Sequence, residues 1–187
     1  MRASTAPIEI VIDGTDGAGK TPCVEVVCAR FRSRGLTVAS HAPYREREVY
    51  PLWATAPEEA AAVIVDVMAR RRAASADARV IVWDRGWPTA YVSTDHAAAR
   101  ALFLPLPTRT VLLLSTTKRT RRQARRHPNA GVWATDEARV QRYHAAYHAL
   151  ELPAPSDALR FVPDATDTFD LEAIADAVEA SVRDALR

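Results

Sequence analysis

The sequence predicts an α/β fold in which helices cover both faces of a five-stranded parallel sheet. Short apolar runs alternate with longer segments of helical periodicity, as in chains built from strand–helix–strand units. The runs are continuously apolar instead of alternating, which suits strands that are buried on both faces. The length of 187 residues suffices for one domain with a real core and is too short for two comfortable ones. We therefore expect a single domain over residues 1–187.

Five apolar runs are the expected strands, at residues 8–13, 36–40, 80–84, 110–115 and 159–162. Segments of helical pattern follow them, at residues 20–34, 57–74, 89–102, 117–126 with 135–150, and 171–186. The last helix is the clearest, because Asp170 is a suitable N-cap and apolar residues recur at helical spacing from Leu171 to Val182. In sheets of this kind ligands bind beyond the carboxyl ends of the strands, so we expect functional residues directly after strands.

Composition and charge narrow the functional classes. The formal net charge of +2 argues against a general affinity of the whole molecule for nucleic acid or membranes. Cys23 and Cys28 are five residues apart, on different faces of a helix, so we expect neither a disulfide nor a shared metal ion. The first apolar run is far too short to span a bilayer, and no signal-like segment precedes it. We expect a cytoplasmic protein.

A complete G-x-x-x-x-G-K-[ST] motif follows the first strand and consists of Gly14, Thr15, Asp16, Gly17, Ala18, Gly19, Lys20 and Thr21. Its glycines let backbone N–H groups turn toward phosphates, and the next helix directs its positive end at them. We expect Lys20 to contact the β- and γ-phosphates of ATP and the Thr21 hydroxyl to ligate Mg²⁺. The alternative, a glycine-rich turn without nucleotide, is disfavoured by the strand before it and the helix after it. The motif makes the expected fold a P-loop NTPase-type three-layer sandwich.

The third expected strand ends in an acid, Asp84, and Arg85 follows it. Four apolar residues before an acid form the Walker B pattern, whose carboxylate reaches the metal shell or the attacking group. The alternative, a helix cap or a loop acid, is less favoured beside a phosphate-binding motif. At the same edge of the sheet, Arg85 would meet an anionic acceptor with two parallel hydrogen bonds.

The chain resembles the thymidylate kinase family of nucleoside monophosphate kinases. The resemblance rests on the phosphate-binding motif with Asp16 at its third position and on Asp84-Arg85 after a strand. Looser matches follow in the order of that family, and they are Ala90-Tyr91, Pro107-Thr108 before a strand, and a helix with Arg139, Tyr143 and Tyr147. The resemblance covers most of the chain, but only the phosphate-binding motif is highly specific.

The resemblance implies five parallel strands with helices on both faces, a flexible lid over ATP, and a homodimer. It also implies roles for single residues on the acceptor side. Asp16 would hydrogen-bond to the sugar hydroxyl of the acceptor, and Arg85 would hold the phosphoryl groups. Tyr91 would press on the deoxyribose and exclude a 2′-hydroxyl.

The departures from the family also fall on the acceptor side. The loop whose arginine grips the acceptor phosphate is missing, and the segment 43–48 stands in its place. Arg45 or Arg47 would replace that arginine, with Arg45 favoured because the Arg-Glu order is kept. Gly86 replaces the aromatic residue that the family places after Asp-Arg, and Val92 replaces a glutamine. ATP binding is therefore predicted more firmly than the identity of the acceptor.

A basic segment contains Lys118, Arg119, Arg121, Arg122, Arg125 and Arg126 within nine residues. On a helix several of them lie one turn apart and repel each other, so an anion is the natural partner. We expect a lid over residues 117–135, with Arg122 and Arg126 stabilising the charge of the transferring phosphoryl group. A solvated basic face is the alternative. A nucleic-acid patch is less favoured, because no aromatic residues are interleaved.

The predicted reaction is transfer of the γ-phosphoryl group of ATP, with Mg²⁺, to a nucleoside monophosphate similar to dTMP. The expected catalytic residues are Lys20, Asp84, Arg85, Arg122 and Arg126. A monophosphate needs no strong base, whereas for a hydroxyl acceptor Asp84 would act as general base. A deoxynucleoside or another small hydroxyl compound is the alternative acceptor. From a different class, a regulatory or nucleic-acid-associated ATPase would release phosphate without any acceptor.

Overall fold

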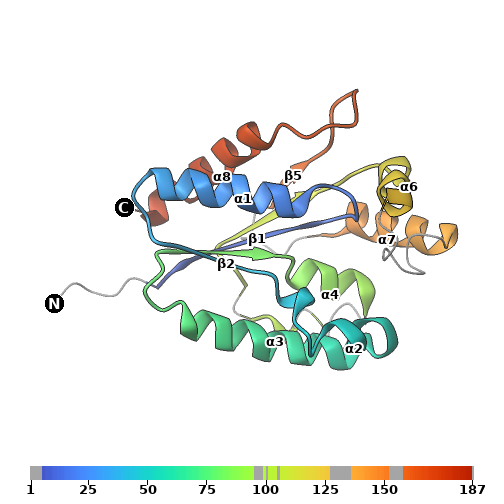
Figure 1. The fold of residues 1–187 in the computed structure, drawn as a ribbon, viewed down its shortest axis with the longest axis horizontal. Coiled ribbons are helices and arrows are strands. Elements are labelled where there is room, and N and C mark those ends of the chain that lie inside the picture. Colours follow the sequence, from blue (N-terminus) through green and yellow to red (C-terminus); the bar gives the residue numbers. More distant parts are fainter. Residues whose placement is uncertain are drawn as a thin grey trace.

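A computed structural model of the chain describes residues 6–94, 99, 101–104, 106–126, 136–151 and 158–186, without the side chains of 54 and 123–126. A five-stranded sheet lies between two layers of helices (Figure 1). Its strands are parallel and stand in the order β2-β3-β1-β4-β5. Their bounds are β1 Ile8–Gly14, β2 Val38–His41, β3 Val80–Asp84, β4 Arg109–Leu113 and β5 Leu159–Phe161. The predicted P-loop NTPase-type sandwich is confirmed.

Each face of the sheet has its own apolar core, because the side chains of a strand alternate between the two faces. Ile8, Ile10 and Ile12 of β1 pack on one face with α1 (Lys20–Ser33) and α8 (Leu171–Leu186). Val11 points to the other face, which is covered by α3 (Pro57–Ala74), α4 (Trp87–Ser93) and α7 (Glu137–Ala149). In Figure 1, α1 and α8 lie above the sheet and α3 lies below it. Burial on both faces explains why the strands are continuously apolar.

Short elements connect the layers at the carboxyl end of the sheet: the 3-10 turn η1 (Pro43–Arg45), α2 (Tyr50–Thr55) and α6 (Thr117–Arg126). Helix α2 was not predicted, since six residues carry no periodic signal. Its Trp53 packs edge-to-face on Tyr44, with ring centroids 5.0 Å apart. This contact links η1 to α2 and thereby positions the segment that carries Arg45.

Several expected boundaries differ from the structure, most clearly those of β2 and α4. Strand β2 begins at Val38 instead of residue 36, because Leu36 N–H donates to Phe31 O at 3.2 Å and closes the end of α1. Helix α4 begins at Trp87, two residues before the expected start at 89, and ends at Ser93. Residues 95–98 of the expected helix lie outside the described part. The earlier start follows from Gly86, which serves as the N-cap.

The strand register brings three segments together at one edge. Ile12 of β1 lies opposite Asp84 of β3, and Gly14 lies opposite Leu113 of β4. The phosphate-binding motif, the acid after the third strand and the residues after the fourth therefore meet in space. In the described part of the chain, none of the helices is long and apolar enough to cross a membrane.

Candidate active site

The loop between β1 and α1 has a backbone that only glycine accommodates at its first position. Gly14 has φ 135°, and a Cβ there would lie 2.0 Å from Leu113 O. Gly17 and Gly19 also have positive φ, at 76° and 87°. Gly19 is the N-cap of α1 and supplies no side-chain cap, so the first N–H groups of the helix stay available to an anion.

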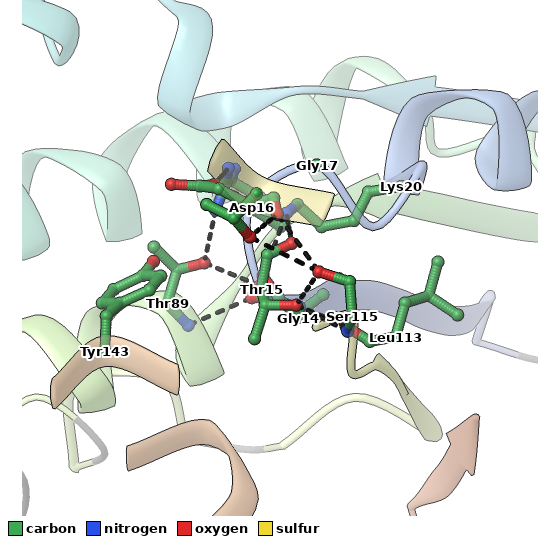
Figure 2. Close-up of polar contacts among 12 residues, drawn as sticks. Gly14, Thr15, Asp16, Gly17, Lys20, Thr89, Leu113, Ser115 and Tyr143 are labelled. Atoms are coloured by element: carbon green, nitrogen blue, oxygen red, sulfur yellow. Dashed lines mark hydrogen bonds and ion pairs between the residues drawn. The ribbon is translucent and has the colours of Figure 1, made fainter. Parts of the chain in front are cut away.

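The loop is held in shape by β4 through a set of buried hydrogen bonds. Thr15 N–H donates to Leu113 O at 3.0 Å, and Ser115 N–H donates to Thr15 Oγ1 at 2.7 Å. The hydroxyls of Thr15 and Ser115 are 2.8 Å apart. Figure 2 shows these residues stacked beneath Asp16 and Lys20. The cradle is thus preformed by the protein itself.

Lys20 turns its ammonium group into the loop and is 7% exposed. Nζ donates to Gly14 O at 2.9 Å and to Thr15 O at 2.8 Å, and it lies 3.7 Å from an Asp16 oxygen. Burial, and next the charge of Arg85, lower the pKa of Lys20 from 10.5 to about 8, although nearby carboxylates act in the opposite direction. Burial therefore disfavours the charged form of Lys20, and an anionic phosphate beside the ammonium group would stabilise it.

Thr21 and Asp84, the two predicted metal ligands, are in direct contact. Thr21 Oγ1 donates to Asp84 Oδ2 at 2.7 Å, and Asp84 is almost fully buried. Arg45 Nη2 donates to Thr21 Oγ1 at 2.7 Å and lies 3.4 Å from Asp84 Oδ2, so a cationic group already rests against both oxygens. A hydroxyl and a carboxylate fit Mg²⁺, which binds few protein ligands and completes its shell with phosphates and water. Among the described residues, no group of three or more His, Cys, Asp or Glu side chains forms a metal site.

Asp16 and Arg85 form an ion pair at the same edge, through Asp16 Oδ1 and Arg85 Nη2. Burial alone would raise the pKa of Asp16, but the charges of Arg85 and Lys20 outweigh it and lower this pKa from 3.8 to about 2. Arg85 has φ 76°, a left-handed conformation that costs a non-glycine residue about 1–2 kcal/mol. Strain of this kind is held at functional sites by the surrounding structure.

The low pKa of Asp16 predicts how stability depends on pH. The ionised carboxylate stabilises the folded state above pH 3.8, and this contribution is lost as the pH falls through about 2. Urea unfolding between pH 5 and pH 2 should show Asp16→Asn less stable than the wild type at pH 5, with the gap closing toward pH 2. Asp66→Asn, at an exposed position of α3, is the control with no such gap. A gap that stays constant over this range would contradict the prediction.

Helix α6 is bound to the loop by its first turn, through residues that the sequence did not single out. Arg119 Nε donates to Gly17 O at 2.8 Å, and its guanidinium lies 5.3 Å from the centre of the Phe169 ring. Thr120 Oγ1 donates to Asp16 O and is 2.9 Å from His144 Nε2 of α7. The predicted lid thus begins as a helix fastened to the phosphate loop.

Of the two lid arginines expected to be catalytic, the structure describes the side chain of Arg122 alone. Arg122 is half exposed and pairs with Asp167 at 3.0 Å. The side chain of Arg126 and residues 127–135 of the expected lid lie outside the described part. Among the described side chains of α6, Arg119 is the arginine that contacts the phosphate loop. The arginines of α6 differ in whether they lie on the side of the helix that faces the phosphate loop. A run of basic residues in the sequence does not show which side that is.

Tyr91, the aromatic residue among the expected acceptor residues, lies on α4. Its ring packs edge-to-face on Trp87 of the same helix, with centroids 6.1 Å apart. Tyr143 of α7 lies beside Thr89 in Figure 2. Burial, and next the charge of Asp16, raise the pKa of Tyr143 to about 12. Tyr143 is therefore a second aromatic candidate on the acceptor side, while the role of Tyr91 stays a prediction.

Comparisons with known proteins support the fold. No protein-family model matches this chain, and no curated sequence does. The structure is similar to a deoxyadenosine kinase from M.mycoides that was solved with the products dCMP and a flexible dCDP. The match covers 95% of this chain and 100% of that chain, with a TM-score of 0.62 and 13% sequence identity. The likeness shows a P-loop kinase-like α/β fold and does not single out the thymidylate kinase family.

Proposed function

We propose that this protein is an ATP-dependent phosphotransferase that transfers the γ-phosphoryl group to a nucleoside monophosphate similar to dTMP. The observation that carries the proposal is the preformed loop, in which Lys20 Nζ donates to Gly14 O and the Thr21 hydroxyl donates to Asp84. Mg²⁺ bound there would neutralise phosphate charge and align the triphosphate. These contacts support the proposed binding of ATP and Mg²⁺.

On the ATP side, the position of each residue suggests its role in the proposed reaction. The free N–H groups of the loop and of the α1 N-terminus bind phosphate oxygens, and Lys20 adds a positive charge near the γ-phosphate. Thr21 and Asp84 would supply two oxygens to hold the metal ion. Arg119 is placed beside the loop, where its charge would favour the developing negative charge of the phosphoryl group.

On the acceptor side, two arginines stand at the same sheet edge. Arg85 is fixed by its ion pair with Asp16, and Arg45 rests on the metal ligands. Thr21 and Asp84 would hold Mg²⁺, and Arg45, which lies against both, would meet the phosphate of the acceptor. Asp16 would then orient a sugar hydroxyl, in keeping with the predicted roles.

A deoxynucleoside acceptor is the second candidate, and a specific observation favours it. The charge of Arg85 is already matched by Asp16 in this structure, which leaves less positive charge for an acceptor phosphate. The structural neighbour described above is itself a deoxyadenosine kinase. Both candidate reactions use the same ATP-binding residues. They differ only in the acceptor group that attacks the γ-phosphate, which is a phosphate oxygen in one and a hydroxyl in the other.

An acceptor panel tests the proposal. ADP release is measured with ATP and Mg²⁺ alone, then with nucleoside monophosphates, deoxynucleosides and small hydroxyl compounds. Release that depends on a monophosphate supports the first proposal, and release that depends on a nucleoside supports the second. Phosphate release without any acceptor, stimulated by DNA or RNA, would indicate an ATPase and refute both.

The lid arginines give a paired prediction. Arg119→Gln should lower kcat by about 10²-fold, because it removes the lid cation that touches the loop. Arg122→Gln should change kcat by less than about threefold, since its ion pair with Asp167 is largely exposed. Steady-state kinetics at saturating ATP compare the two variants. A larger loss in Arg122→Gln would reverse the assignment of the lid arginine.

A further inference from the structure

Asp13 of β1 is a fully buried carboxylate directly before the phosphate loop. Its Oδ1 accepts hydrogen bonds from Gly14 N–H at 2.7 Å and from the hydroxyls of Thr89 at 2.7 Å and Tyr147 at 2.8 Å. Its Oδ2 accepts from the N–H groups of Gly86 at 2.9 Å and Thr89 at 3.1 Å. Five donors compensate for the water that a buried carboxylate loses.

These donors belong to separate parts of the site. Gly14 begins the phosphate loop, whereas Gly86 and Thr89 form the first turn of α4, where N–H groups have no partner within the helix. Gly86 directly follows Arg85, whose own N–H donates to Ile12 O at 2.9 Å. Ile12 O and Asp13 Oδ2 therefore hold the left-handed turn at Arg85 against β1, while Asp13 Oδ1 binds the first N–H group of the phosphate loop.

We infer that Asp13 is a positioning residue, a clamp that fixes the phosphate loop relative to the turn that carries Arg85. The loop belongs to the ATP half and the turn to the acceptor half, so the kinetic consequence rests on the proposed function. In-line transfer depends on the relative placement of donor and acceptor more than on the binding of either. Loosening the clamp should therefore lower kcat, while substrate affinities change little.

Asp13→Asn tests the clamp without changing the size of the side chain. An amide offers one acceptor oxygen, whereas N–H donors lie on both sides of Asp13. The oxygen is expected to face Gly86 and Thr89, because the NH₂ group on the other side can donate to the Thr89 and Tyr147 hydroxyls. Gly14 N–H then faces an NH₂ group and loses its acceptor.

Two measurements follow from this geometry. Hydrogen exchange of the Gly14 amide, followed by NMR, should become at least about tenfold faster in Asp13→Asn, while exchange at Gly86 stays the same. In the transfer assay, kcat should fall at least about tenfold, and the ATP affinity and the acceptor KM should stay within about threefold. Unchanged exchange at Gly14 overturns the clamp, whether or not the chain transfers phosphate.

Thr110→Val is the matched control, because it removes a buried hydrogen bond of 3.2 Å between Trp87 Nε1 and Thr110 Oγ1 in the same core. It should lower thermal stability without changing exchange at Gly14 or kcat. An equal loss of kcat in both variants, or faster exchange with unchanged kcat in Asp13→Asn, overturns the positioning role. A wild-type chain without acceptor-dependent transfer refutes the proposed function instead, and exchange at Gly14 still decides the clamp.

Discussion

Substitution of Lys20 by methionine is expected to lower the turnover of phosphoryl transfer by about 10³-fold while the protein stays folded. Methionine keeps the length of the side chain and removes the ammonium group that lies between the loop carbonyls. No other cationic group occupies that position among the described residues of the loop. The loss should appear in kcat at saturating ATP, because the charge acts most strongly on the transferring phosphoryl group.

The free energy of unfolding of Lys20→Met is a second measurement, because it shows whether a loss of turnover comes from a loss of folded protein. The pKa of Lys20 falls from 10.5 to about 8 on folding, so its charged form is disfavoured in the folded chain by roughly 3 kcal/mol at neutral pH. This cost disappears when the charge is removed. We therefore expect urea unfolding to show Lys20→Met at least as stable as the wild type at pH 7.

Lys118→Met is the matched control, since Lys118 is the only other lysine of the chain and is exposed on α6. It should retain turnover within about twofold. Calorimetry with ATP and Mg²⁺ shows whether Lys20→Met still binds nucleotide through the loop amides. Near-normal turnover in Lys20→Met would refute the assignment of the cradle.

The sheet and the phosphate loop could be predicted because their signals are local. Strands buried on both faces are continuously apolar, and the loop needs glycines at positions where a side chain would collide, as at Gly14. The contact between Thr21 and Asp84 follows from the fold, since Thr21 lies in the first turn of the helix after β1 and Asp84 ends the neighbouring strand β3. Arg45, which the sequence favoured over Arg47 for the acceptor phosphate, contacts Thr21 in this structure, and its role stays a prediction.

What the sequence did not reveal depends on contacts between distant segments. Asp13 seemed to be only the end of a strand, but its donors at residues 86, 89 and 147 are recognised only once three elements have packed. Arg119 and Arg122 are equivalent in a basic run until the side on which α6 meets the loop is known. Gly86 is explained by space, because a Cβ there would lie 2.9 Å from Val11 Cγ1. Packing against Val11 therefore leaves no room for the aromatic residue that the thymidylate kinase family places at this position.

Substitution of Asp84 by asparagine is the second change with a large expected effect. We expect kcat to fall by about 10²–10³-fold, with ATP affinity reduced only a few-fold. The Thr21 hydroxyl donates a hydrogen bond of 2.7 Å to Asp84. The amide oxygen of asparagine can still accept this bond, so the loop keeps its shape. The charge that would face Mg²⁺ is lost, and the Mg²⁺ concentration needed for half-maximal rate should rise. Asp66→Asn is the control, and unchanged turnover in Asp84→Asn would remove Asp84 from the mechanism.

The same variant separates two roles of Asp84 through the choice of acceptor. A carboxylate that acts through the metal ion affects every acceptor equally, because the metal holds the donor phosphates. A general base affects a nucleoside hydroxyl far more than a monophosphate, whose oxygen needs no deprotonation at neutral pH. Asp84 accepts its short hydrogen bond from the phosphate-loop hydroxyl, and Arg45 lies 3.4 Å from the same oxygen. The contact with the Arg45 cation favours the first role, so an equal loss of kcat with both classes of acceptor is the expected result. A loss confined to hydroxyl acceptors would assign Asp84 to proton transfer instead.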